Sequence, residues 1–195
     1  MPELEIIKDY ANPDSFANKI APFRGGGSYH KVDEPPEKFI EISTLIPAND
    51  EYHTLDIPNL QRCVGVLLIF APYSSTLDQC VYMLGSHVTP MRKNLRQIQE
   101  IFINNFLKLK GTHYVSHVIM AGGKINNSTN CIHFANSTNL YFKQFLYLPF
   151  LKYTKFVQFL PQVNTTKTHM WATGNRVIVM HELDDGNVAY NEHRY

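Results

Sequence analysis

Residues 63–87, CVGVLLIFAPYSSTLDQCVYMLGSH, determine how the rest of the chain is interpreted. Two apolar runs, 64–70 and 80–84, flank a segment at 71–79 that is rich in turn-forming residues. Two such runs joined by such a segment are typical of two β-strands and a loop. The sequence therefore predicts a β-hairpin that begins with the thiol of Cys63 and ends with the imidazole of His87.

The spacing of these two residues also predicts a register. Their midpoint is residue 75, in the middle of the loop, so a symmetric hairpin without a bulge places Cys63 opposite His87. Directly opposed residues project to the same face, with Cβ atoms roughly 4.5–5.5 Å apart. In this register Gly65 lies opposite Gly85, and the two missing side chains leave a slot for a substrate.

A cysteine and a histidine at that separation can form a thiolate–imidazolium pair. The imidazole activates the nucleophile and supplies the proton that the leaving group needs. Two alternatives remain open. Cysteine is among the most buried residue types and often serves as a small hydrophobe, and a one-residue bulge would send the two side chains to opposite faces.

Composition indicates an ordinary globular domain. The chain has 195 residues, of which 44% are hydrophobic and 18% charged, with a formal net charge of +1. This charge gives no electrostatic footprint for nucleic acid, and no apolar stretch approaches the roughly 20 residues that a transmembrane helix needs. The first residues, MPELEIIKDY, lack the pattern of a signal peptide. We therefore expect a protein made in a reducing cytosol, with no nucleic-acid or membrane partner.

The cysteines and histidines give little support for cross-links or metal. Three cysteines, with no CxxC pair, do not indicate a disulfide framework or a zinc site. His113 and His117 are four residues apart on a predicted strand and would share one face. A metal site needs several convergent donors, and no third ligand is evident.

The remaining segments follow a recognisable order. Residues 1–50 are expected to form an irregular arm with a first strand at 39–45, and a long loop leads from Pro47 to Cys63. A helix is predicted at 90–110, with Thr89 as N-cap and Gly111 as its end. Further predictions are strands at 114–120, 156–160, 176–180 and 188–190, a helix at 139–151, and a hairpin turn at 184–187.

This order of elements resembles the chemoreceptor glutamine deamidases (CheD), whose catalytic fold is shared with the cytotoxic necrotizing factor toxins. The resemblance covers residues 54–190. It is carried by CVGVLL at 63–68, HVTP at 87–90, the predicted helix ending at Lys110, HVIMAGGK at 117–124, FANSTNLYFKQFL at 134–146, GNRVIVM at 174–180 and DDGNVAY at 184–190.

The chain departs from this family near the nucleophile. Gln61 and Arg62 stand where the family has small residues before the cysteine. The family's threonine, six residues before the nucleophile, falls on Ile57, so Thr54 is the nearest candidate for a polar third member. The hairpin loop is longer than in the family, and residues 1–50 have no counterpart in it.

The resemblance implies an α+β fold in one compact domain: a β-sandwich of mostly antiparallel sheets with two main helices packed outside, and a catalytic part at 51–195. It also implies a protein glutamine deamidase that needs no cofactor or metal. Cys63 would attack the glutamine amide carbon, backbone N–H groups of Arg62 and Cys63 would hold the oxyanion, and His87 would serve as acid and base.

Other functions remain open. The same residues suit a transglutaminase or another thiol hydrolase, a non-catalytic binding module on the same scaffold, or, least of all, a metal-binding protein using the nine histidines. The expected partner is a protein that carries the target glutamine. A bacterial effector or toxin, translocated into a host cell without a classical signal peptide, is the preferred setting.

Overall fold

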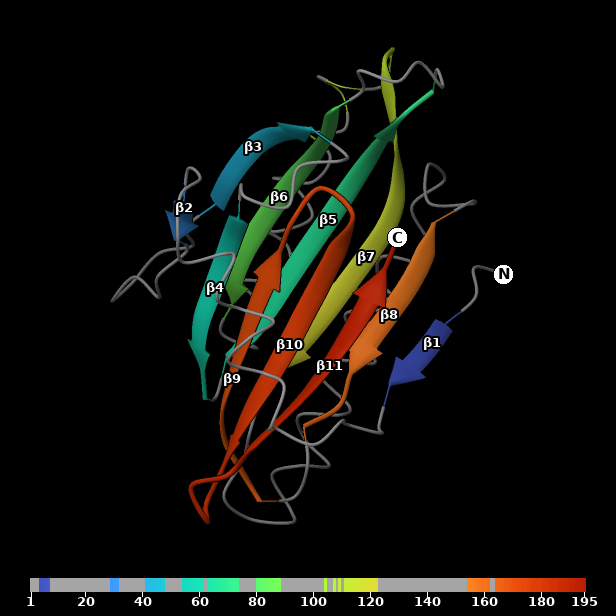
Figure 1. The fold of residues 1–195 in the computed structure, drawn as a ribbon. Helices are drawn as coiled ribbons and strands as arrows, with labels where there is room; N and C mark the ends of the chain where they lie inside the picture. Colours follow the sequence, from blue (N-terminus) through green and yellow to red (C-terminus); the bar gives the residue numbers. More distant parts are fainter. Residues whose placement is uncertain are drawn as a thin grey trace.

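The computed structural model describes residues 4–7, 29–31, 41–47, 54–61, 63–73, 80–88, 104, 107, 109, 111–122, 154–161 and 164–195. These residues form eleven β-strands in two sheets, which lie against each other as two layers (Figure 1).

The first sheet is built around β5 (Val64–Pro72), with strand order β1-β8-β7-β5-β6-β3. Its other strands are β1 (Leu4–Ile7), β3 (Glu41–Pro47), β6 (Cys80–Val88), β7 (His113–Gly122) and β8 (Lys155–Phe159). β5 pairs antiparallel with β6 and β7, whereas β8 pairs parallel with β7 and β1. Residues 64–70 are buried on both faces of the sheet, which explains their continuous apolar sequence.

The second sheet has five strands in the order β11-β10-β9-β4-β2. They are β2 (Tyr29–Lys31), β4 (Thr54–Leu60), β9 (Thr165–Ala172), β10 (Arg176–Leu183) and β11 (Val188–Arg194). All neighbours run antiparallel except β2 and β4.

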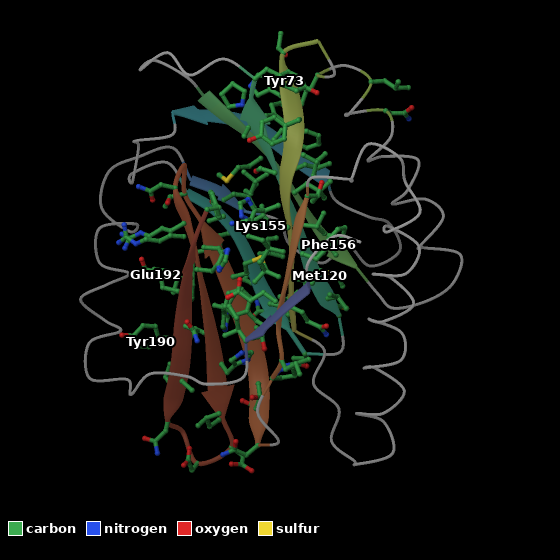
Figure 2. All side chains as sticks on the ribbon, turned by 90° about the vertical axis from the view of Figure 1, so that its right-hand side faces the viewer. Tyr73, Met120, Lys155, Phe156, Tyr190 and Glu192 are labelled. Atoms are coloured by element: carbon green, nitrogen blue, oxygen red, sulfur yellow. The ribbon has the colours of Figure 1, made fainter. Side chains whose placement is uncertain are left out.

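The main core lies between the two sheets. Leu55 and Ile57 of β4 meet Leu67 and Ile69 of β5, and Met170, Val177 and Val179 join them from β9 and β10. Figure 2 views the two layers from the side: Met120 and Phe156 belong to the first sheet, and Tyr190 and Glu192 belong to the second. Tyr73 marks one end of the sandwich in this view.

The predicted fold class is wrong in its helices. The described residues form two mixed sheets and contain no helical element packed outside them. From the predicted helix at 90–110 the structure describes only Asn104, Leu107 and Leu109, each in helical conformation, and the predicted helix at 139–151 lies outside the described residues. In the part of the chain that is described, no helix is long and apolar enough to cross a membrane.

Two segments for which no strand was predicted are strands. Residues 54–60 were part of a predicted loop because Asp56, Pro58 and Asn59 favour turns, yet they form β4. The Thr-rich residues 165–172 form β9. Both strands gain their order from pairing with each other and from core contacts of Leu55, Ile57 and Met170, and tertiary contacts of this kind override local propensity.

Several predicted strands are confirmed, with shifted ends. β3 corresponds to the strand expected at 39–45, β7 to 114–120, β8 to 156–160 and β10 to 176–180. The turn at 184–187 joins β10 to β11, and its Leu183 N–H donates to the Asn187 carbonyl at 2.8 Å. Within the predicted N-terminal arm, β1 and β2 each occupy an edge of a sheet.

Candidate active site

Cys63 lies where the chain passes from one sheet to the other. β4 of the second sheet ends at Leu60, and β5 of the first sheet begins at Val64 (Figure 1). Asn59 has a positive φ of 57°, and the Gln61 N–H donates to the Asn59 carbonyl at 2.9 Å. This tight turn ends β4 shortly before Cys63, so the candidate nucleophile follows a strand and a short turn instead of the predicted long loop.

The hairpin of β5 and β6 forms, but its register differs from the prediction. Gly65, not Cys63, pairs with His87, and Gly85 pairs with Leu67. The midpoint of the hairpin is therefore residue 76, one residue later than a symmetric loop predicts. The loop at 73–79 sets the register weakly, because the packing of alternate side chains determines it.

Cys63 and His87 nevertheless share one face. Cys63 belongs to the hydrophobic cluster between the sheets, to which Leu67 and Ile69 of β5 and Met83 of β6 also contribute. His87 is opposite Gly65, whose missing Cβ would point at Leu60 and Ile57 of the other sheet. The two residues are thus diagonal neighbours on the inner face, a relation in which residues are about 7–8 Å apart and their Cβ atoms are somewhat closer.

Both residues are deeply buried. The exposed fraction is 4% for Cys63 and 3% for His87. The predicted slot beside them is filled, because a Cβ on Gly65 would lie 2.8 Å from the Leu60 Cδ1 and one on Gly85 would lie 2.5 Å from the Leu55 Cδ2. The glycines therefore let the second sheet approach closely, and leucine side chains occupy the space that was predicted for a substrate.

Thr54, the predicted third member, is not brought to Cys63. Thr54 begins β4, whereas Cys63 follows its end. At about 3.3 Å per residue, six strand residues separate Thr54 from Leu60 by about 20 Å. Arg62 lies outside the described residues, so the proposed oxyanion N–H groups have no described geometry there.

His113 and His117 do not share a face, contrary to the prediction. His113 pairs with Pro72 and His117 pairs with Ile69, with a register shift between them. Ser116 is the extra residue of this bulge, and its hydroxyl donates to the Ile69 carbonyl at 3.1 Å. Among the described residues, no group of three or more potential ligands could hold a metal ion.

A histidine cluster that the sequence did not reveal lies between the sheets, where His117 pairs with Ile69 toward the other end of β5 from Cys63. The rings of His117 and His193 are 5.7 Å apart, and the Tyr195 ring is 5.5 Å from that of His117. The Tyr195 hydroxyl donates to the carbonyls of Thr173 and Arg176. Burial, with smaller effects of His193 and Lys155, lowers the pKa of His117 from 6.5 to about 4.

A second group of polar residues lies toward the end of β10 that leads into the turn to β11, away from the β9–β10 connection. Thr168 Oγ1 is 2.7 Å from His181 Nδ1, and burial lowers the pKa of His181 from 6.5 to about 3. His169 Nε2 contacts Glu182 at 3.2 Å, while its Nδ1 accepts the Asn59 N–H at 3.4 Å. The alternation of RVIVMHEL at 176–183 could have placed His181 on the inner face, because strand faces repeat every two residues.

Comparison of the chain with protein-family models, curated proteins and solved structures gives no match. The site is therefore interpreted from its own geometry. A thiol and an imidazole on adjacent strands, at the end of the strands where the chain crosses between sheets, suit nucleophilic attack with proton transfer.

Proposed function

We propose that this chain is a cysteine-dependent protein glutamine deamidase. The observation that supports it is the placement of Cys63 and His87 on the same inner face of the sheet. His87 pairs with Gly65, and Cys63 lies two residues before Gly65. A nucleophile and a base from rigid strands keep their relative position, which nucleophilic catalysis requires.

The reaction proceeds in two steps. The Cys63 thiolate attacks the carboxamide carbon of a glutamine side chain, and the tetrahedral intermediate collapses as protonated His87 gives its proton to the departing ammonia. This leaves a thioester and a neutral imidazole. His87 then removes a proton from water, which attacks the thioester and releases glutamate and the Cys63 thiol. The target protein gains one negative charge, and no cofactor or metal takes part.

The substrate of this proposal is a glutamine of a protein partner, consistent with a bacterial effector or toxin that acts on a host protein. The test is peptide mass spectrometry of cell lysates incubated with wild type, Cys63→Ala or Cys80→Ala. Glutamines converted to glutamate by wild type and Cys80→Ala, but not by Cys63→Ala, support the deamidase. Equal conversion by wild type and Cys63→Ala would contradict it.

The same experiment separates a transglutaminase from a deamidase. An added primary amine would replace water at the thioester and give an amide-linked product instead of glutamate. If cross-linked product predominates over glutamate when the amine is present, the acceptor assignment is wrong while the role of Cys63 stands.

A non-catalytic binding module is the second candidate, and burial is the observation that favours it. Cys63 is only 4% exposed, and Leu60 and Leu55 fill the space at both hairpin glycines. A buried cysteine among leucines usually acts as a small hydrophobe. For such a module we expect Cys63 to resist iodoacetamide near neutral pH, even in variants that enlarge the space around it.

A further inference from the structure

The packing of Leu60 places one side chain against the elements that carry the proposed catalytic pair. Its Cδ1 would be 2.8 Å from a Cβ on Gly65, the residue opposite His87. Its own Cβ would be 2.7 Å from a Cβ on Gly122, and the Cys63 carbonyl oxygen would be 2.8 Å from the same point. Leu60 therefore fills a niche bounded by two glycines beside Cys63.

The niche has the dimensions of one side chain. Gly65 and Gly122 have no side chains to occupy it, and Leu60 is fully buried in it. A leucine side chain has four heavy atoms and a glutamine side chain five, so a glutamine needs little more room than Leu60 takes. A larger acyl group would need movement of the sheets themselves, because interiors are packed at close to crystal density.

The segment that carries Leu60 is irregular. The pairing of β4 with β9 shifts register between Ile57 and Leu60, which makes Pro58 and Asn59 part of a bulge. Proline has no N–H for the ladder, and Asn59 adopts the left-handed conformation. Bulges loosen strand pairing locally and redirect side chains, so this end of β4 can open at lower cost than its regular start.

We propose that the Leu60 side chain occupies the space into which the substrate glutamine side chain binds, and that it controls access to Cys63. The bulged end of β4 must move outward before a carboxamide side chain can enter between Gly65 and Gly122. This inference rests on the proposed function, because it assigns the niche to the substrate of that reaction. It restricts the substrate class to single unbranched side-chain carboxamides.

The test compares Leu60→Ala with Leu55→Ala. Both variants remove the same atoms from β4, but Leu55 lies against Gly85 and Leu60 lies against Gly65 and Gly122. Iodoacetamide labelling of Cys63, followed by peptide mass spectrometry, should be at least about tenfold faster in Leu60→Ala than in wild type. Leu55→Ala should label within about threefold of wild type, because its vacancy is not beside Cys63.

A milder variant guards against unfolding as the cause. Leu60→Val should accelerate labelling to an intermediate degree, and the acceleration should persist at denaturant concentrations where circular dichroism shows a folded protein. Equal acceleration in the Leu60 and Leu55 variants, or none in either Leu60 variant, would overturn the proposal.

The labelling readout does not depend on deamidase activity. If Leu60→Ala accelerates labelling but no glutamine is converted by wild type, Leu60 controls access and the proposed function fails. If wild type converts glutamine but labelling is unchanged, the function stands and the assignment of the niche fails.

Discussion

Gly122 shows at the level of one residue how the two sheets meet beside Cys63. Its φ is 98°, in the region that favours glycine, and a Cβ there would lie 2.8 Å from the Cys63 backbone oxygen. Gly186 also has a positive φ, of 82°, but nothing lies within 4 Å of its Cβ position. Gly111 has open space as well and no positive φ. Comparing these three glycines therefore separates the effect of backbone strain from the effect of steric crowding.

Alanine substitutions at these glycines should form a graded series. Gly122→Ala combines strain with a backbone clash and should lower the free energy of unfolding by about 2–4 kcal/mol. Gly186→Ala carries the strain alone and should cost about 1 kcal/mol, and Gly111→Ala should stay within about 0.5 kcal/mol of wild type. Urea unfolding measures all three; a Gly122 variant as stable as the Gly111 variant would contradict the close approach at Cys63.

Three strands show at the level of elements what the sequence could and could not predict. β5 and β10 were predicted because continuous or alternating apolar residues mark them. β4 was missed because Pro58 and Asn59 look like a turn, and only its pairing with β9 makes residues 54–60 a strand. The partner of His87 was also mispredicted, since loop symmetry is a weaker guide to register than the packing of both sheets.

The bulge in β7 determines the face on which His117 lies, because it shifts the register between His117 and His113. The Ser116 hydroxyl donates its proton to the Ile69 carbonyl and therefore accepts from His117 Nδ1 at 3.1 Å. Ser116→Ala should lower the free energy of unfolding by about 0.5–1.5 kcal/mol, and Ser116→Thr, which keeps the hydroxyl, should recover most of this loss. Equal stability of wild type and Ser116→Ala by urea unfolding would exclude a structural role for this hydroxyl.

Buried histidines in two places make the stability of the whole sandwich depend on pH. His117 lies near His193, Tyr195 and Lys155, and His181 contacts Thr168, while the charge of His169 disfavours protonation of His181. Burial holds the pKa of His117 at about 4 and that of His181 at about 3. The sequence indicated neither cluster, because the first joins residues of both sheets and the second joins residues of different strands of the second sheet.

These lowered pKa values set the sign of the pH dependence. Below a pH of about 6.5, these histidines bind protons in the unfolded chain but stay neutral in the folded chain, so the free energy of unfolding falls as the pH decreases. The loss continues down to the folded-state pKa of about 4 for His117 and about 3 for His181. The urea midpoint should therefore drop between about pH 7 and about pH 5. His117→Gln should reduce the slope, and an unchanged slope in that variant would show that His117 does not contribute.

The central claim is that His87 activates Cys63. Its most direct test is the rate of chloroacetamide labelling of Cys63 near neutral pH in wild type, His87→Ala and His113→Ala, repeated in the Leu60→Ala background so that access is equal. A thiol without an activating imidazole is only a few per cent ionised near pH 7. Labelling of Cys63 in His87→Ala should therefore be slower than in wild type by a factor of at least about ten. His113→Ala, altered on the other face of β7, should match wild type. Equal rates for wild type and His87→Ala in both backgrounds would contradict the catalytic pair.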